Sequence, residues 1–199
     1  MNSMRSMKSG VRLALVALVL SVAPPAFADI LIYSTALSGA NENPTTPSLG
    51  IGTALVTVDL DALTMRVETT FSGLTGTTTI AHIHCCVDPP GNVGVATPTP
   101  TFPGFPAGVT FGSYDNTLDL ALASSYNAAF VTANGDSVDG AMNALLDGLD
   151  AGRAYLNIHT SFRSGGEIRG FLTLVPEPGT WALMIAGLGG LLLLGRRAR

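Results

Sequence analysis

Alternation of apolar and polar residues in the first half of the chain most constrains its fold. Segments 52–60 and 63–73 both repeat with a period of two, the spacing that puts successive side chains on opposite faces of a β-strand. The sequence Leu-Asp-Ala at residues 60–62, where the two segments meet, predicts a tight hairpin. The face expected to be buried consists of Ala54, Val56, Val58, Met65, Val67, Thr69 and Phe71.

The rest of the central region continues this pattern, with one helical interruption. Strands are expected at 30–37, 79–84, 153–160 and 166–175, and the last two predict a second hairpin. Residues 88–113 are rich in Pro, Gly and Thr and predict a long loop. Segments 124–135 and 137–152 have helical character, and the second has Ser137 as its N-cap and Gly152 at its end. We therefore expect a mainly β protein: an antiparallel β-sandwich with Greek-key-like connections and a short helical insertion.

The N-terminus has the three parts of a secretory signal peptide. Basic residues precede the apolar run Leu13–Leu20, and Ala26-Phe27-Ala28 provides small residues around a cleavage point after Ala28. The run is too short to span a bilayer. We expect residues 1–28 to be removed by signal peptidase, so that a single domain of residues 29–175 remains before the C-terminal tail.

The C-terminal tail, residues 176–199, also has three parts. Pro176-Glu177-Pro178 is followed by the apolar stretch Trp181–Leu194 and an arginine-rich end. This arrangement resembles the PEP-CTERM sorting signal of Gram-negative bacteria. The resemblance implies a tail helix held transiently in the inner membrane, with its arginines in the cytoplasm. It also implies cleavage by an exosortase, a membrane cysteine protease, and delivery to the cell envelope or the exterior.

The central domain is strongly acidic. All 14 acidic residues of the chain lie between Asp29 and Glu177, together with only four arginines and no lysine, so this segment carries a net charge of about −10. Nucleic acid is a poor partner for such a surface. Cations or a basic polymer are better partners, and solubility alone also accounts for the charge.

Six short blocks in the domain resemble a CHRD domain, the module that is repeated in chordin and occurs alone in many secreted bacterial proteins. The resemblance extends from about Leu37 to Leu174 and implies a binding or scaffolding domain that is not an enzyme, with exopolysaccharide or other envelope components as expected partners. The blocks are "LSGANENP", "GTALVTVD", "FSGLTG", "AHIH", "YLNIHT" and "GGEIRGFL". The cysteine pair Cys85-Cys86 and the helical segment before Arg153 depart from the family pattern.

The three histidines of the chain lie in two of these blocks. His82 and His84 share one face of a strand, about 7 Å apart along it, and His159 shares a face with Asn157. If the two strands approach each other, three imidazoles converge, and three nitrogens form a reasonable site for copper or zinc. The pattern loosely resembles the copper half of copper–zinc superoxide dismutase, but no histidine is left for its bridging position or its zinc loop. A copper- or zinc-binding redox protein is therefore the alternative to a scaffold.

The sequence favours a structural role for the same residues over metal binding. The histidines together with Asn157, Glu167 and Arg169 form an expected buried polar network. Cys85 and Cys86 can form a vicinal disulfide, supply thiolates to a metal held by His82 and His84, or pair between chains. No nucleophile elbow, phosphate loop or zinc-protease helix is recognisable, so no catalytic residue and no certain cofactor are predicted.

Overall fold

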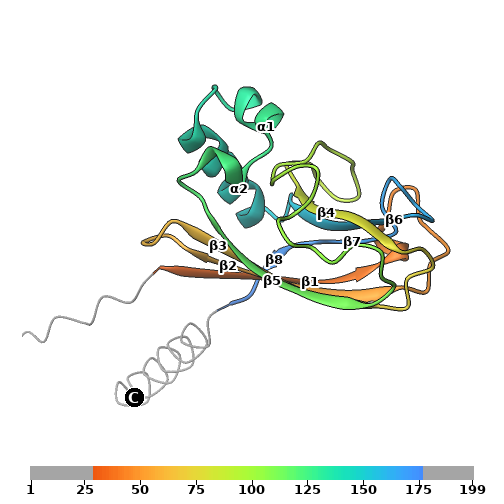
Figure 1. Ribbon diagram of the computed structural model, residues 1–199. Helices are drawn as coiled ribbons and strands as arrows, with labels where there is room; N and C mark the ends of the chain where they lie inside the picture. The colour runs from red at the N-terminus through yellow and green to blue at the C-terminus, as the bar shows by residue number, and fades with distance from the viewer. Residues whose placement is uncertain (1–28, 177–199) are drawn as a thin grey trace, which may run out of the picture.

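The computed structural model describes residues 29–176, which form an antiparallel β domain with a helical part on one side (Figure 1). The predicted signal peptide and the tail from Glu177 onward lie outside the described residues. The strands are β1 (Ile30–Ser38), β2 (Ile51–Asp59), β3 (Thr64–Ser72), β4 (Thr78–His84), β5 (Gly112–Asp119), β6 (Tyr155–Thr160), β7 (Ile168–Phe171) and β8 (Thr173–Leu174), and the helices are α1 (Ala128–Ala133), α2 (Val138–Asp150) and the 3-10 turns η1 (Gly39–Asn41) and η2 (Ala123–Ser125).

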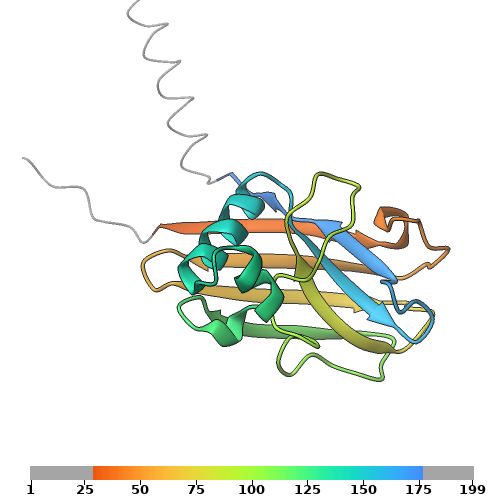
Figure 2. The ribbon, with the colours of Figure 1, turned by 90° about the horizontal axis from the view of Figure 1, so that it is seen from above.

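All described strands belong to one curled sheet. Its order is β4-β6-β7-β1-β2-β3-β5, and the short β8 also pairs with β1. Because β7 meets β1 only at the Arg169–Ser38 pair, the sheet bends there, and β4, β6 and β7 lie over the other strands (Figures 1 and 2). The expected mainly β, sandwich-like fold is confirmed, with both layers belonging to a single sheet.

Both predicted hairpins are present. β2 and β3 pair along their full length, from Ile51 opposite Ser72 to Asp59 opposite Thr64. At the turn between them, the Asp59 carboxylate accepts hydrogen bonds from the backbone N–H groups of Asp61 and Ala62, at 3.0 and 2.8 Å. Such side chain–backbone bonds fix a tight turn locally. β6 and β7 form the second pair.

The core fills the space between the two layers. The predicted face of β2 and β3 is buried, as are the inward residues Ala81 and Ile83 of β4 and Leu156 and Ile158 of β6. Phe71 stacks on Phe105 from the loop after β4, with ring centroids 5.7 Å apart. Leu74 and Ile168 both contact the space beside Gly50.

The predicted loop 88–113 ends in a strand that the sequence did not predict. Residues 112–119 form β5, which pairs with β3 at the edge of the sheet. Only Tyr114 and Leu118 of this strand are buried, so its alternating pattern is too short to stand out from the Pro- and Gly-rich sequence before it. The preceding loop runs beside β4, where the N–H groups of Ala96 and Phe102 donate to backbone carbonyls of that strand, each at 2.9 Å.

The longer helix has the boundaries that the sequence predicts. Ser137 caps α2 by accepting a hydrogen bond from the N–H of Gly140 at 3.0 Å. Gly152, with φ of 65°, lets the chain turn back after the last turn of α2. Leu145 and Leu149 point into the core. Among residues 29–176, no helix has the length and apolar character needed to cross a membrane.

Candidate metal centre

The histidines lie on the face of β4 and β6 that points away from the core between the layers. His82 is directly opposite Asn157 on β6, and His84 is opposite Tyr155. Because side chains alternate along a strand, the neighbours Ala81 and Ile83 fill the core while both histidines face the other way. Loops that extend from the strand ends cover this polar face, and all three histidines are buried.

The structure brings the three predicted ligands together. One ring nitrogen from each of His82, His84 and His159 lies within 4.8 Å of the others. The ring of His82 lies edge-on to the other two rings, with centroids 5.0 Å from His84 and 4.8 Å from His159. His159 approaches the other two histidines because β6 is the direct neighbour of β4 in the sheet.

Backbone carbonyls orient the imidazole rings. The Nδ1 atom of His84 lies 2.8 Å from the carbonyl oxygen of Val93, and Nδ1 of His159 lies 2.8 Å from that of Ser164. A ring N–H that donates to a carbonyl leaves the lone pair on the other nitrogen, which is how proteins orient histidines that bind metals. The backbone of Pro100 lies near the His82 ring, whose Nδ1 atom has no hydrogen-bond partner among the described residues.

Three buried nitrogen atoms are left without a hydrogen-bond partner within the described residues. They are Nδ1 of His82, Nε2 of His84 and Nε2 of His159. Burying an unpaired polar atom costs free energy, so one such atom on each of three neighbouring rings needs an explanation. A single cation that accepts all three lone pairs accounts for them.

Burial keeps these imidazoles uncharged. Desolvation, reinforced by the neighbouring His159 and His84, lowers the pKa of His82 to about 3. Desolvation likewise lowers the pKa of His84 to about 4 and lowers that of His159. Neutral imidazole is the form that binds metal, so the three ligands need no deprotonation near neutral pH.

The geometry fits a small transition metal after a modest adjustment. Metal–nitrogen bonds of roughly 2.0–2.1 Å place tetrahedral ligand atoms roughly 3.3 Å apart. The ligand atoms here lie up to 4.8 Å apart, so an ion would draw the rings closer together. Three protein ligands also leave a coordination position open.

Tyr155 and Arg169 support one side of the centre. The Tyr155 ring stacks on His84 with a centroid distance of 4.7 Å, and the Arg169 guanidinium lies 4.7 Å from the Tyr155 centroid on β6. The guanidinium is fully buried and donates to three carbonyl oxygens and one side-chain oxygen: those of Asn41, Pro90 and Gly91, and Oδ1 of Asn92. It therefore fixes the loop that ends at Val93, whose carbonyl orients His84.

The expected network of Asn157, Glu167 and Arg169 is not a single network. Glu167 accepts hydrogen bonds from Thr160 and Ser48 and from the backbone N–H groups of Thr75 and Gly76. Burial favours a raised pKa for Glu167, but these bonds lower its pKa below the usual value. Asn157 lies between His82 and Arg169 in the register and donates only a long bond, 3.5 Å, to the Gly165 carbonyl.

Glu42 is a buried acid near the centre that sequence reasoning did not identify. Burial raises its pKa to about 7, opposed by Arg169, whose Nε lies 3.8 Å from a Glu42 carboxylate oxygen. Its other oxygen has no partner, and it lies with the Asn157 amide beside Gly166. Its only signal in the sequence was its position in the block 37–44.

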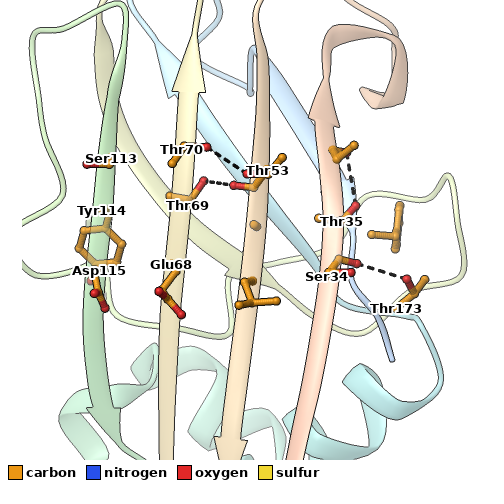
Figure 3. Close-up of a pocket in the computed structure, with 14 residues that line it drawn as sticks. Ser34, Thr35, Thr53, Glu68, Thr69, Thr70, Ser113, Tyr114, Asp115 and Thr173 are labelled. Carbon is orange, nitrogen blue, oxygen red and sulfur yellow. Dashed lines mark hydrogen bonds between the residues drawn. The ribbon is translucent and has the colours of Figure 1, made fainter. Parts of the chain in front are cut away.

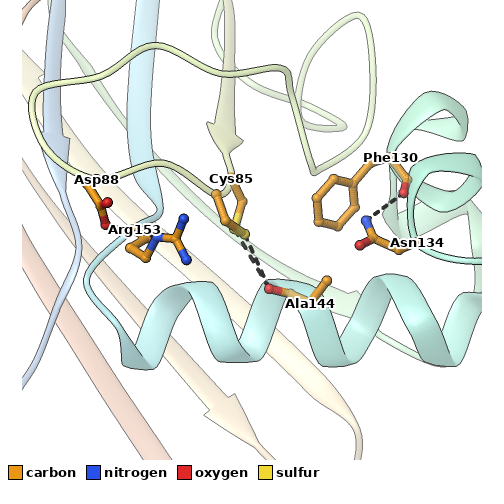
Figure 4. Close-up of a disulfide and its surroundings, with 7 residues drawn as sticks. Cys85, Asp88, Phe130, Asn134, Ala144 and Arg153 are labelled. Atoms are coloured by element: carbon orange, nitrogen blue, oxygen red, sulfur yellow. Dashed lines mark hydrogen bonds and ion pairs between the residues drawn. A yellow bond between two sulfur atoms is a disulfide. The ribbon is translucent and has the colours of Figure 1, made fainter.

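The cysteines form the vicinal disulfide that was one of the three predicted arrangements. Cys85 follows His84, so its side chain points to the opposite face, toward helix α2 (Figure 4). Both sulfur atoms lie near the Ala144 carbonyl of that helix, at 3.9 and 3.3 Å. The sulfur atoms therefore lie away from the histidine rings, and the alternative in which they supply thiolate ligands to a metal is wrong.

One cavity of the described region is lined by residues other than the histidines. It is an open trough of about 940 Å³ whose lining combines apolar side chains such as Leu55 and Phe171 with the polar residues Ser34, Thr53, Glu68, Thr70 and Asp115 from strands β1, β2, β3 and β5 (Figure 3). The hydroxyl oxygens of Thr53 and Thr70 in this lining lie 3.0 Å apart. None of the three histidines contributes to it.

Comparison with known proteins identifies the domain. The family model for the CHRD domain matches residues 33–172, which include the histidine centre, the disulfide and the helical part. No curated protein and no solved structure shows a significant match to this chain. The match agrees with the six blocks recognised in the sequence and spans well over half of the chain, so the protein belongs to the CHRD domain family.

Proposed function

We propose that this CHRD domain binds one copper or zinc ion through His82, His84 and His159. Two observations carry the proposal: one ring nitrogen of each histidine lies within 4.8 Å of the others, and each ring has a buried nitrogen without a partner among the described residues. A purely structural polar network would pair these atoms with donors inside the protein. Membership of the CHRD family suggests an extracellular or secreted binding domain, and a metal ion is a ligand compatible with that class.

Copper is the preferred ion on chemical grounds. Sites built from nitrogen bind Cu²⁺ more tightly than Zn²⁺ at equal availability, and imidazole suits both ions. The acidic domain also favours cations over anions in its surroundings. The proposal concerns binding and not turnover: the chain has only three histidines, so it lacks the bridging ligand of copper–zinc superoxide dismutase.

Metal analysis of the native protein tests this function. The protein is purified from its own host without a histidine tag, so that no foreign ligand is introduced. We expect about one copper or zinc ion per chain, with X-ray absorption showing nitrogen ligands at roughly 2.0 Å. A native protein free of both metals, which also fails to take up either ion after purification, would contradict the proposal.

Export and C-terminal sorting complete the proposed role. The support is the tripartite N-terminal segment 1–28 and the tail 176–199 with its Pro-Glu-Pro motif. The domain would pass through the inner membrane, lose its tail to an exosortase and remain in the envelope or the exterior. Intact-mass measurement checks this: the mature chain should begin at Asp29 and end near Pro176. A species that retains Trp181–Arg199 in a host with an active exosortase would rule out tail cleavage.

A second candidate is metal-independent scaffolding on an envelope component such as exopolysaccharide. The trough of about 940 Å³ favours it, because the hydroxyl and carboxylate groups in its lining can hydrogen-bond to sugar hydroxyls (Figure 3). Retention of the domain on polysaccharide from its own host would support this role if Thr53→Val with Thr70→Val abolishes retention. Unchanged retention in that double variant would exclude the trough.

A further inference from the structure

The vicinal disulfide lies at the junction between the metal centre and helix α2. Cys85 is the residue after His84, at the point where β4 ends. Cys85 is 3% exposed, whereas Cys86 is partly exposed, so Cys86 is the more accessible member of the pair. The pair neither staples distant segments nor contributes to the set of metal ligands.

Helix α2 is shaped to receive the disulfide. The Ala144 carbonyl lies 3.3 Å from the Cys86 sulfur, and one turn later Gly148 faces both sulfurs. A Cβ atom at position 148 would collide with the Cys85 and Cys86 sulfur atoms. The fit of α2 against the end of β4 therefore depends on how the two sulfurs are placed.

The chain that follows the disulfide controls the orientation of His84. Val87 is tied to the end of the helical region by a 3.0 Å bond to the Arg153 carbonyl, and Cys85 is tied to Gly94 by a 3.3 Å bond. Between these anchors, Val93 supplies the carbonyl that accepts the Nδ1–H of His84. The same loop supplies the acceptors from Pro90, Gly91 and Asn92 that hold Arg169.

We propose that Cys85–Cys86 is a thiol-exchange site whose redox state sets the metal affinity of the histidine centre. The effect on metal affinity rests on the proposed metal binding, whereas the thiol exchange does not depend on it. The substrate class is a thiol, either a small thiol such as glutathione or a protein dithiol. The oxidised pair fits the Gly148 recess and keeps the loop 87–94 in the arrangement that orients His84.

The exchange balances without any further reactant. A thiolate attacks the more accessible Cys86 sulfur, the bond between the two cysteines breaks, and Cys85 leaves as a thiolate that takes a proton. A second thiol then attacks the mixed disulfide and releases Cys86, which also becomes protonated. Two thiols are oxidised to one disulfide, and the protein disulfide gains two electrons and two protons.

Reduction should weaken metal binding. Two separate thiols need more room than one disulfide, and Gly148 and the Ala144 carbonyl leave little of it. Relief requires movement of α2 or of the Cys85–Val87 segment, and that segment leads into the loop bonded to His84. Loss of a group that orients a ligating histidine typically costs 10- to 100-fold in metal affinity.

The test compares zinc affinity in the oxidised and the reduced protein by competition with a chromophoric chelator. Zinc is used because thiols do not reduce it, and mass spectrometry confirms the cysteine state. Tris(2-carboxyethyl)phosphine should lower the affinity of the wild type at least tenfold. The variant Cys85→Ala with Cys86→Ala has no sulfur atoms to crowd the helix and should show no response to the reductant. Equal or higher affinity in the reduced wild type would overturn the coupling.

Three further readouts make every outcome decisive. If neither form binds zinc, copper uptake by the oxidised protein decides the proposed function, and the coupling is judged in the metal-free protein from the ring-nitrogen chemical shifts of His84. A change in these shifts on reduction, which the double alanine variant does not show, supports the coupling, and unchanged shifts overturn it. Incubation with millimolar glutathione tests the exchange itself: a disulfide that stays intact, with no mixed disulfide detected, would exclude an exchange site.

Discussion

At the scale of single residues, two kinds of burial distinguish this domain. Phe71 and Leu74 are buried as apolar side chains, whereas His82, His84 and Arg169 are buried as polar ones. Apolar burial stabilises the fold directly, and polar burial stabilises it only when the polar atoms have partners. Arg169 meets that condition with four acceptors, whereas one nitrogen on each histidine does not.

The side chain of Phe71 gives a direct test of the core. It is 4% exposed and stacks on Phe105, so Phe71→Ala removes an aromatic ring and leaves a cavity between the layers. We expect the free energy of unfolding to fall by about 3–5 kcal/mol. Urea unfolding measures the change, with exposed Phe111→Ala as the control that should cost much less. A loss below about 1 kcal/mol for Phe71→Ala would show that the ring is not packed in this way.

Residue patterns predicted some of these positions and not others. Period-two alternation placed Phe71 in the core and both β4 histidines on one face, because a strand has only two faces. The approach of His159 depends on β6 pairing with β4, a contact between segments more than 70 positions apart that alternation does not encode. Glu42 was missed because its burial comes from loops, which have no period.

At the scale of elements, helix α2 packs against the disulfide that follows strand β4. The sequence predicted the cap at Ser137 and the end at Gly152 from local chemistry. It predicted no partner for Gly148, since a glycine inside a helix has no contact that can be recognised without the fold. Strand β5 was missed for the related reason that only two of its residues are buried.

For Gly148→Ala, helix propensity predicts a gain in stability, whereas packing against the disulfide predicts a loss. Replacing a helix-interior glycine by alanine usually stabilises a helix by about 0.5–1 kcal/mol. Here Gly148→Ala should lower stability, because its Cβ would collide with the two cysteine sulfurs. Thermal unfolding compares it with Asn143→Ala, an exposed position on the same helix that should be neutral or stabilising. If Gly148→Ala raises the melting temperature, the close contact does not exist.

At the scale of the whole molecule, an acidic two-layer domain carries a centre of three neutral histidines. The two layers are parts of one sheet, so the strands that hold the ligands continue into those that build the core. The pattern of strands indicated this class of fold, but the order of strands in the sheet could not be read from the sequence, because it depends on pairing between distant segments.

Stability of the metal-free protein should depend on pH through this centre. The histidine pKa values are lowered in the folded state, to about 3 for His82 and about 4 for His84, from the ordinary 6.5. Between these values and pH 6.5 the unfolded chain binds more protons, so stability is full above about pH 6.5 and falls as the pH decreases. Glu42, with its raised pKa, acts in the opposite direction from about pH 4.5 to 7.

Three histidines outweigh one carboxyl group, so the net effect between pH 6.5 and pH 4.5 should be destabilisation on acidification. Urea midpoints across this range measure it, and His82→Gln should reduce the slope because one titrating group is lost. A urea midpoint that stays constant from pH 6.5 to pH 4.5 would show that the histidines are protonated or solvated in the folded state.

Metal titration of four proteins tests the central claim most directly: the wild type, His84→Ala, His159→Ala and the control Ile80→Ala, which shortens a partly buried side chain on the same strand as His82. Copper and zinc affinities are measured by chelator competition on folded, oxidised protein. The account predicts one ion per chain for the wild type and for Ile80→Ala, and at least 100-fold weaker binding for either histidine variant. Equal affinities in all four proteins would contradict it and leave the histidines as a structural network.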